Sequence, residues 1–264
     1  MKKPFFTIIT PTLNSEKYLE ECLKSVETQS FKDWEHIFID AYSRDNTIRI
    51  LRKYKKRNPD KVFIYQYPKK GITDAFNKGI INSKGKFLSF LNSDDLLEKE
   101  ALRKVHNELI RKNTGWLYGG NYIIDKNGKR LYKRENPVFN YKKILYYDSI
   151  CHQSVFTSKK IFKKYGLFNY KHAMDYDYFL RIGKNEIPIR TKFVVCSFRR
   201  SGSNSSYIHW REVLAERKKI AFSYSTTFLD RTIITIFNNL TYLKKLVINF
   251  KVEVCRKMNP YLMK

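Results

Sequence analysis

The chain has 264 residues, 42% of them hydrophobic, which is enough for one large core and a small appendage. Its four cysteines are spread out without a CxxC pair, which argues against a zinc site or a disulfide framework. The formal net charge of +27 indicates a polyanionic partner (nucleic acid, acidic lipid or phosphorylated substrate), or else only a lysine-rich solvated surface.

No apolar stretch approaches the roughly 18 residues that a membrane-spanning helix needs. The apolar run after Lys2 and Lys3 is short and is interrupted by Pro4 and Thr7, which is not the pattern of a signal peptide. We therefore expect a protein on the cytosolic side of the membrane, with reduced thiols.

Predicted strands and helices alternate in the N-terminal part of the chain. Aromatic and β-branched runs predict buried strands at 5–10, 34–39, 62–67 and 86–91. Apolar residues at three-to-four spacing predict a helix after each of the first three strands; Ser15 can cap the first, and Asn58 ends the second before a proline. This alternation is typical of a parallel sheet, whose ligands bind beyond the carboxyl ends of the strands. The loops at Pro11, Asp40 and Asn92 should therefore converge on one crevice.

The pattern is less regular in the second half of the chain. It predicts a helix at 98–112, a short strand at 116–118, a tight hairpin turn at 126–129, a short helix capped by Ser158 and ended by Gly166, a helix from near Asp175, and a flexible loop at 197–206. Beyond Trp210 the chain is predicted to be helical and basic.

The sharpest local feature is the run from Asn92 to Asp95, which follows the fourth predicted strand directly and ends in two adjacent carboxylates. Their like charges repel, and a divalent cation relieves the repulsion, because Mg2+ or Mn2+ prefers carboxylate oxygens together with substrate phosphates. The alternative is that the run only caps the next helix. Asp40 and Asp74 favour the cation site, since they bring further acids to neighbouring strand ends in an otherwise basic chain.

Thr12 and Asn14 follow the first predicted strand, where a hydroxyl and an amide can hydrogen-bond a base or a ribose. The chain has neither GxGxxG nor GxxxxGK[ST], so the dinucleotide and P-loop interpretations lack their glycines.

Four segments, in order and with the same spacing, resemble glycosyltransferase family 2, the inverting transferases with a GT-A fold. These segments are 8–14, 39–47, 71–79 and 92–95. The resemblance implies an α/β fold with a mainly parallel, Rossmann-like sheet flanked by helices. It also implies that Thr12, Asn14, Asp40 and Asp74 bind the nucleotide, with Asp40 reaching the base.

The fourth segment resembles the family's DxD-type metal motif. By this resemblance Asp94 lies near the ribose and the metal, and Asp95 is the direct ligand of a Mn2+ or Mg2+ ion that bridges the donor's diphosphate. The motif departs from the family pattern at its first position, which is Asn92 rather than Asp. Three cationic residues are candidates to help the metal stabilise the leaving diphosphate: Arg199, Arg200 and His209.

A looser resemblance covers 151–154 and 174–181, the second of which resembles the segment with the family's general base. We expect Asp175 to be that base, with Asp177 as the second choice; the alternative is that Asp175 caps its helix. An inverting transfer needs a carboxylate that takes the acceptor's proton while C1 is attacked opposite the leaving diphosphate. His152 is expected to be a satisfied core residue.

The sequence divides into a GT-A domain at 1–208, with a nucleotide-binding half at 1–97 and an acceptor half at 98–208, and a basic tail at 209–264. Apolar residues of the tail recur at helical spacing among lysines and arginines. Such a helix can lie on an anionic membrane, at roughly 1 kcal/mol per Lys or Arg. Alternatively, it packs on the domain or on a second subunit of a homo-oligomer.

Resemblance and charge together predict a hexosyltransferase that moves a sugar from a nucleotide-diphosphate donor, expected to be a UDP-sugar. The expected acceptor is a lipid-diphosphate-linked glycan of bacterial surface-polysaccharide biosynthesis, such as lipopolysaccharide or capsule, at the inner face of the cytoplasmic membrane. One alternative is a single-stranded nucleic-acid-binding protein, which leaves the clustered acids unexplained. Another is a catalytically inactive sugar-nucleotide scaffold.

Overall fold

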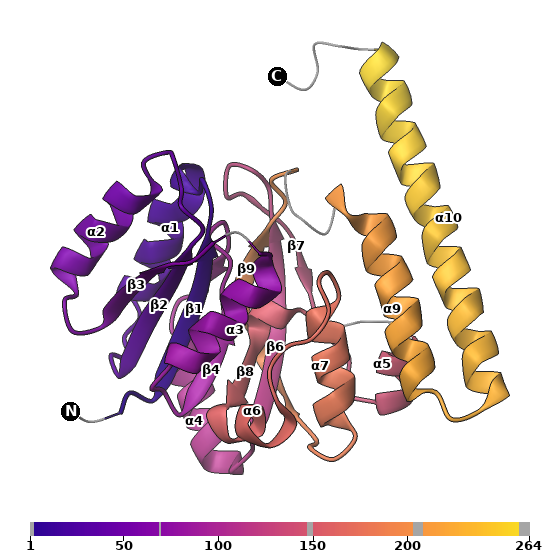
Figure 1. Ribbon diagram of the computed structural model, residues 1–264, viewed down its shortest axis with the longest axis horizontal. Helices are drawn as coiled ribbons and strands as arrows, with labels where there is room; N and C mark the ends of the chain where they lie inside the picture. The colour runs from indigo at the N-terminus through magenta and orange to yellow at the C-terminus, as the bar shows by residue number, and fades with distance from the viewer. Residues whose placement is uncertain (1–2, 69, 147–149, 203–207, 259–264) are drawn as a thin grey trace.

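The computed structural model describes residues 3–68, 70–146, 150–202 and 208–258 (Figure 1). The N-terminal part alternates strands with helices: β1 Phe6–Thr12, α1 Glu16–Glu27, β2 Trp34–Asp40, α2 Thr47–Arg57, β3 Val62–Gln66, α3 Ile72–Asn82 and β4 Phe87–Phe90. The C-terminal part contains β5 Leu96–Leu97, α4 Ala101–Lys112, β6 Trp116–Ile124, β7 Arg130–Arg134, α5 Tyr141–Tyr146, the 3-10 turn η1 His152–Ser154, β8 Val155–Ser158, α6 Lys159–Tyr165, α7 Met174–Gly183, β9 Ile189–Arg199, α9 Trp210–Tyr224 and α10 Phe228–Met258.

Within the described residues, nine strands form one sheet in the order β3-β2-β1-β4-β8-β6-β9-β5, with β7 paired to β6. The first four strands are parallel, as predicted. Beyond β4 the sheet is mixed, because β8 runs antiparallel to both β4 and β6 while β9 runs parallel to β6. The carboxyl ends of β1, β2 and β4 therefore meet at one edge of the sheet.

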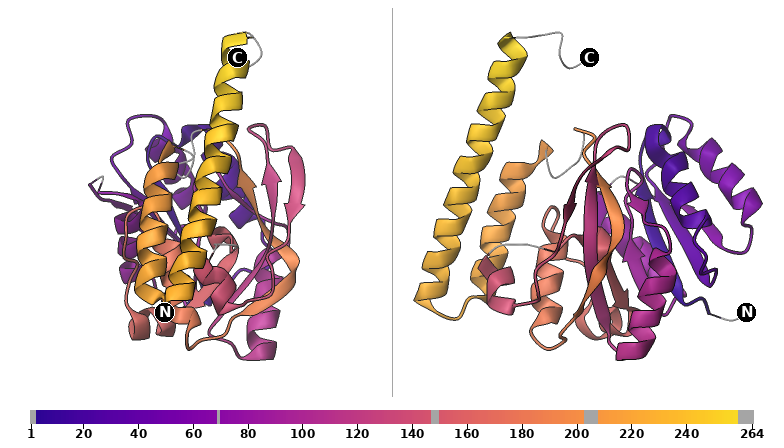
Figure 2. Two further views of the ribbon diagram at one scale, coloured as in Figure 1. Left: turned by 90° about the vertical axis from the view of Figure 1, so that its right-hand side faces the viewer. Right: turned by 180° about the vertical axis from the view of Figure 1, so that it is seen from behind.

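Alternate side chains of the strands enter two hydrophobic cores, one on each face of the sheet. In β1, Ile8 packs in one core with Leu19 and Leu51, and Ile9 packs in the other with Phe76. Helices α1, α2 and α4 cover the first face, and α3, α6 and α7 cover the second (Figures 1 and 2). Burial on both faces explains why these strands read as continuous apolar runs.

The four predicted N-terminal strands are confirmed with small shifts at their ends. β1 continues through Pro11 to Thr12 instead of stopping at the proline. The backbone nitrogen of Pro11 faces the side of β4, which has already ended at Phe90 opposite Ile9. The missing N–H therefore removes no hydrogen bond of the ladder.

The sequence does not predict β5, β8 or β9. Strand β9 includes Ser197 and Arg199, so the loop predicted at 197–206 begins later, and its residues 203–206 lie outside the described part of the chain. Helix α4 starts at Ala101 rather than at Glu98, because the backbone N–H of Glu98 donates to Val195 as β5 pairs with β9. These strands are short or carry charged residues, and they are stabilised by pairing with distant strands and by burial of side chains such as Phe156 and Val195.

The local turn predictions are confirmed. The Asp125 N–H donates to the Lys129 carbonyl at 2.9 Å, and Gly128 has φ +84° in the hairpin between β6 and β7. The Ser158 hydroxyl caps α6, and Gly166, with φ +82°, follows its last turn. Each feature follows from local turn chemistry.

Helix α9 and the first turns of α10 pack on the domain, side by side at one end of the molecule (Figure 2). Glu216 of α9 accepts backbone N–H groups of His172 at 2.7 Å and Ala173 at 2.8 Å, just before α7. Ile220 and Ile234 join the core that α7 contributes to. This part of the chain thus adopts the alternative in which the tail packs on the domain, and the division at residues 208 and 209 stays a prediction.

The rest of α10 extends away from the domain (Figure 1). Apolar side chains at helical spacing are exposed along its described part: Ile236, Phe237, Leu240, Leu243 and Val247. No helix in the described part of the chain is both long and apolar enough to cross a membrane.

Gly79 tests the contact between α3 and the sheet. A Cβ at this buried position would overlap the Cγ2 of Ile9. Replacing a helical glycine by alanine ordinarily stabilises by about 1 kcal/mol, whereas overpacking costs about 1–3 kcal/mol. We expect Gly79→Ala to lower the free energy of unfolding by about 1 kcal/mol or more in urea titrations, while the exposed control Ile81→Ala changes it by less. A stabilised Gly79→Ala variant would contradict this packing.

Candidate active site

Asp40 ends β2 at the carboxyl edge of the sheet and is fully buried. Its Oδ1 accepts the hydroxyls of Thr12 at 2.9 Å and Ser43 at 2.6 Å, and its Oδ2 accepts the Ser43 N–H at 3.0 Å. Thr12 lies opposite Asp40 in the β1–β2 register. The fold thus brings the predicted pair together, and one lone pair of Oδ2 has no partner in these three bonds and can accept from a ligand.

Asn14 ties the loop after β1 to the loop after β2. Its φ of +48° lies in the left-handed region that Asn tolerates. Its N–H donates to the Ser43 hydroxyl at 2.9 Å, and its Oδ1 accepts the Arg44 N–H at 2.9 Å. Asn14 therefore holds the loop after β1 against the loop after β2 through its backbone and side chain.

Asp74 lies exposed in the first turn of α3, beyond the carboxyl end of β3. The neighbouring Thr73 hydroxyl donates to the Tyr170 carbonyl at 2.8 Å and contacts the Met174 sulfur at 3.0 Å. These contacts place the start of α3, with Asp74, beside the start of α7, with Asp175.

Asp95 is fully buried in the loop between β4 and β5, directly before β5. Its Oδ2 accepts the side-chain amides of Asn92 at 3.0 Å and Gln153 at 2.9 Å, and its Oδ1 accepts the Arg199 backbone N–H at 2.9 Å. Counting lone pairs leaves one site on Oδ1 for a further partner. The residue before α4 that takes the cap position is Glu100, so the alternative in which this run caps that helix is wrong.

Asp94 lies beside Asp95, half-buried. Burial raises the pKa of Asp95 well above its usual value, and the charge of Asp94 raises it further. Burial also raises the pKa of Asp94, opposed by the charge of Arg199 and a hydrogen bond with Ser201. With both pKa values above those of the unfolded chain, the pair destabilises the fold as the pH rises through them.

These residues fit a divalent cation. The Asn92 Oδ1 is buried without a hydrogen-bond partner among the described residues, next to two carboxylates whose charged forms are disfavoured. In the same part of the chain, no three His, Cys, Asp or Glu side chains gather where they could hold a metal ion. A cation here would thus use one or two carboxylates together with donor phosphates, as Mg2+ sites commonly do.

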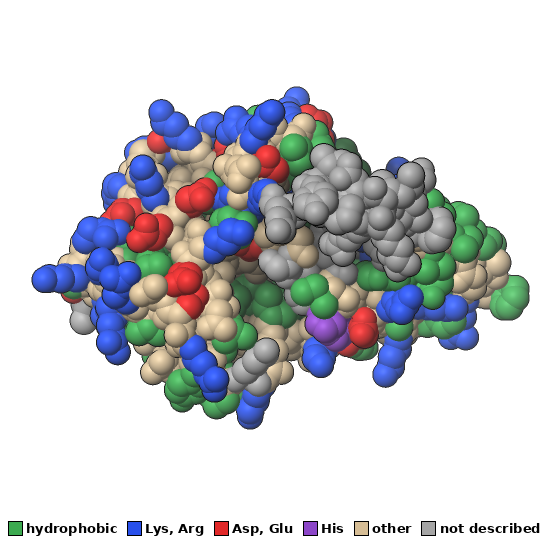
Figure 3. Space-filling view, turned by 90° about the horizontal axis from the view of Figure 1, so that it is seen from above, with side chains coloured by type: hydrophobic (Ala, Val, Ile, Leu, Met, Phe, Trp, Pro, Cys, Tyr) green, Lys and Arg blue, Asp and Glu red, His purple; other side chains and the backbone are tan. Residues whose placement is uncertain are grey.

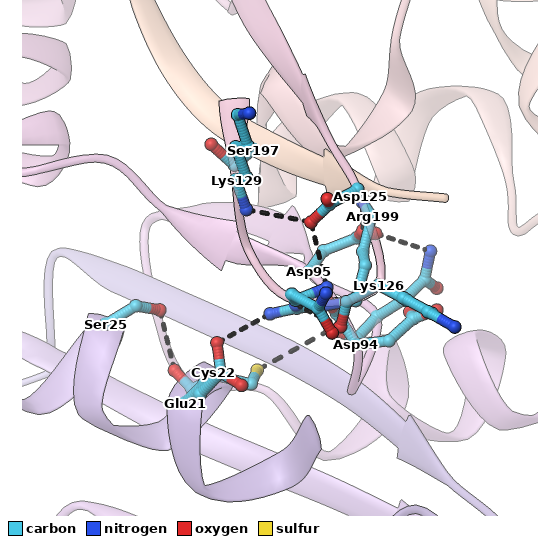
Figure 4. Close-up of polar contacts among 12 residues, drawn as sticks. Glu21, Cys22, Ser25, Asp94, Asp95, Asp125, Lys126, Lys129, Ser197 and Arg199 are labelled. Atoms are coloured by element: carbon cyan, nitrogen blue, oxygen red, sulfur yellow. Dashed lines mark hydrogen bonds and ion pairs between the residues drawn. The ribbon is translucent and has the colours of Figure 1, made fainter. Parts of the chain in front are cut away.

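Arg199 packs against this site and contacts Asp94, Lys126 and Glu21 (Figure 4). Its guanidinium is fully buried, donates to the Asp94 carbonyl at 2.9 Å and to Glu21 at 2.7 Å, and stacks over Tyr18 at 4.5 Å. The expectation that Arg199 contacts the diphosphate does not fit this burial. Its role in the structure is to balance the charge behind Asp94 and Asp95.

Asp175 lies in the first turn of α7, whose cap position is Ala173, so Asp175 does not cap the helix. Its Oδ2 lies 3.4 Å from the Nδ1 of His152, and its Oδ1 accepts the Tyr176 N–H at 2.9 Å. Burial raises the pKa of Asp175, but His152, the Tyr176 N–H and the charge of Arg217 outweigh burial and hold it below its usual value. Asp175 is thus a charged carboxylate at neutral pH.

Asp177, the second choice for the base, lies in the core instead. It is 3% exposed; its Oδ2 accepts the Arg181 guanidinium at 2.5 Å and its Oδ1 accepts the Tyr224 hydroxyl at 3.1 Å. A carboxylate held in this way between α7 and α9 is not placed to reach an acceptor. The geometry therefore leaves Asp175 as the candidate.

Gln153 is a site residue that the sequence did not single out. It connects Asp95 to the turn η1, and the preceding His152 contacts Asp175. The sequence feature that could have indicated Gln153 is its position in the segment 151–154.

Viewed onto the carboxyl edge of the sheet, the surface is hollowed near its centre, with hydrophobic side chains in the hollow, acidic side chains to one side and many lysines and arginines around it (Figure 3).

A mixed sheet with acids at the carboxyl edge of its parallel half is the architecture of the GT-A glycosyltransferases. The chain resembles the crystal structure of S. aureus TarS 1-349 in complex with UDP-GlcNAc, with TM-score 0.68 and 21% identity over 88% of this chain and 71% of that chain. It also resembles the mannosyltransferase PcManGT from Pyrobaculum calidifontis in complex with GDP-Man and Mn2+, with TM-score 0.63 and 15% identity over 99% and 83% of the two chains. At these identities the likeness shows the fold, which is GT-A.

The family follows from the sequence profile of Glycosyl transferase family 2, which matches residues 7–187. The chain belongs to this family. It is 29% identical over 233 residues, 81% of this chain and 84% of the relative, to a PGL/p-HBAD biosynthesis glycosyltransferase of Mycobacterium bovis. Family membership makes the chain a glycosyltransferase and does not favour the nucleic-acid-binding alternative.

The two adjacent acids should respond differently to neutralisation. Without added cation, Asp94→Asn removes a repelling charge and should raise the melting temperature by about 2 °C or more, as about 1 kcal/mol does for a chain of this size. Asp95→Asn places an NH2 group among three donors and should destabilise by about 1–3 kcal/mol. Thermal and urea unfolding in EDTA measure both; equal effects of the two variants would contradict this account.

Proposed function

We propose that this glycosyltransferase moves a sugar, with inversion, from a UDP-sugar to a hydroxyl of a lipid-diphosphate-linked glycan in surface-polysaccharide biosynthesis. The observation that supports it most is the convergence of three carboxylate sites on one edge of the sheet. Asp40 is aligned by Thr12 and Ser43, Asp95 is aligned by three donors, and Asp175 is connected to Asp95 through two consecutive residues, His152 and Gln153.

In the proposed donor site, Thr12, Asn14, Asp40 and Asp74 bind the nucleoside. The lone pair of Asp40 that has no partner among the described residues accepts an N–H of the base. The TarS structure contains UDP-GlcNAc, which makes a UDP-sugar the first donor to examine. Asp94 lies towards the ribose and the diphosphate.

In the proposed reaction, Asp175 takes the proton of the acceptor hydroxyl. The acceptor oxygen forms a bond to C1, and the bond from C1 to the diphosphate oxygen breaks, so the nucleoside diphosphate leaves with the bonding electrons on the opposite face. Asp175 has a lowered pKa and is a weak base, so its contribution comes from position.

A Mn2+ or Mg2+ ion held by Asp95 and Asp94 would supply positive charge for the leaving diphosphate. Two further oxygens could also contact this ion. They are the Asp95 Oδ1, which has a remaining lone pair, and the Asn92 Oδ1, which has no hydrogen-bond partner among the described residues. PcManGT contains Mn2+ in its complex with GDP-Man, which makes Mn2+ the first ion to use.

Donor and metal binding can be measured before any acceptor is known. We expect a UDP-sugar with Mn2+ to raise the melting temperature, since about 100-fold excess over Kd adds roughly 2.7 kcal/mol, and EDTA to remove this shift. Asp175→Asn should keep the shift and lower kcat by about 10²–10⁴-fold. The exposed control Asp60→Asn should keep both the shift and the wild-type kcat.

If uridine, guanosine and thymidine donors all leave the melting temperature unchanged, this would contradict the proposed donor site. A wild-type protein that binds donor but never transfers or hydrolyses it would instead support the inactive scaffold. Transfer that survives in Asp175→Asn would show that another group is the base.

The proposed acceptor is anchored in lipid, and we propose that the distal part of α10 holds the enzyme at the anionic inner face of the cytoplasmic membrane. The exposed apolar side chains of Leu240, Leu243 and Val247 lie near Lys244 on a chain of net charge +27. Apolar burial and attraction to acidic headgroups act together in such helices.

Vesicle sedimentation tests this contact. The wild type should bind vesicles with phosphatidylglycerol and not vesicles of phosphatidylcholine alone. Replacing Leu240, Leu243 and Val247 by Ser should weaken binding at least tenfold, since each buried CH2 contributes about 0.8 kcal/mol, while the control Asn239→Ser should not. Unchanged vesicle binding of the triple variant would assign this face to another role. So would a dimer that the wild type forms and the triple variant does not.

A further inference from the structure

His152 has the environment of a functional residue rather than of a satisfied core histidine. Its Nδ1 lies 3.4 Å from Asp175, and its Nε2 is buried without a hydrogen-bond partner among the described residues. The ring packs edge-on against Phe76, with centroids 5.9 Å apart. A buried polar atom without a partner is costly, and such atoms in native proteins call for an explanation beyond packing.

The next residue, Gln153, holds the other functional carboxylate. Its Nε2 donates to the Asp95 Oδ2 at 2.9 Å, and its Oε1 lies 3.0 Å from the Cys151 sulfur as an acceptor. Two consecutive side chains of η1 therefore point to the two acids that the proposed reaction uses, one on the donor side and one on the acceptor side.

The turn that carries both side chains is fixed at each end. The N–H and the hydroxyl of Ser154 both donate to the Cys151 carbonyl, at 3.0 Å and 2.7 Å. The chain then enters β8, which pairs with β4 and β6 in the middle of the sheet. Such a turn has little freedom to let its two side chains move independently.

We propose that η1 sets the separation of the two carboxylates, and that His152 is the positioning residue that holds Asp175 towards an acceptor placed by the donor site. The inference rests on the proposed function, because it assigns Asp175 as the base. His152 donates from Nδ1 to the Asp175 Oδ2 while the Tyr176 N–H holds Oδ1. Both oxygens are thereby oriented, and each retains a lone pair for the acceptor's hydroxyl proton.

The contact between His152 and Asp175 is long in the structure. At 3.4 Å it exceeds the usual 2.7–3.2 Å of an N–H···O hydrogen bond. Catalytic hydrogen bonds often tighten only when substrate binds. A misplacement of the base by about 1 Å can cost about 10²-fold in rate, so a side chain that fixes its position has a large effect without touching substrate.

The test compares His152→Ala with His152→Asn, whose amide can donate from nearly the place of Nδ1. We expect His152→Ala to lower kcat about 10–100-fold with the donor KM unchanged within about twofold, and His152→Asn to stay within about threefold of the wild type. In an Asp175→Asn background, His152→Ala should add less than about a twofold loss, because the two residues act as one unit. Melting temperatures show whether each variant is folded, and His152→Phe, which keeps a ring against Phe76 but has no donor, takes the place of His152→Ala if that variant does not fold.

Losses that multiply in the double variant, or a fully active His152→Ala, would overturn the inference while leaving the proposed function in place. So would a higher donor KM with unchanged kcat, which a merely structural role would give. A wild type that turns over no donor would overturn the proposed function, and the inference with it.

Discussion

The burial of Asp95 next to a second carboxylate is the constraint on which the rest of the site depends. A buried charge is costly unless donors surround it, and here the donors come from three places in the chain: the loop after β4, the turn η1 and the end of β9. The parallel half of the sheet and the mixed half therefore meet at one carboxylate. The contacts that offset the cost of burying Asp95 also fix the position of Gln153, and through it the turn that reaches Asp175.

Asp94 and Asp95 repel each other and are costly to bury, and the charge of Arg199 opposes part of this cost. Its buried guanidinium lies behind Asp94 and contacts Glu21, so the acids are partly balanced from inside the protein. Of the two carboxylates, Asp94 is partly exposed and Asp95 is fully buried. In the proposed function, the surrounding lysines and arginines would attract an anionic donor to that edge, and a cation held by the acids would complete the charge balance.

The helices at the C-terminal end are connected to the site as well. Glu216 of α9 accepts the backbone N–H groups just before α7, and Tyr224 at the end of α9 donates to Asp177. Helix α7 carries Asp175, so α9 supports the segment that positions the proposed base. The exposed apolar side chains from Ile236 to Val247 lie further along α10, so the membrane contact proposed for this helix would leave the support by α9 in place.

The sequence by itself determined the alternation of strands and helices, the edge at which the loops converge, and the acids Asp40, Asp94 and Asp95. These depend on hydrophobic periodicity and on residues adjacent to a strand end, which are local properties. The tertiary structure decided that Asp177 rather than Asp175 faces the core, since positions two residues apart on a helix differ by about 200° and only packing shows which is buried. It also decided that Arg199 lies inside and that His152 and Gln153 join the site. Their partners are far away in sequence, 58 residues for Gln153 to Asp95 and 104 for the Arg199 N–H to Asp95, and no local pattern records which distant strand or turn will supply a hydrogen bond.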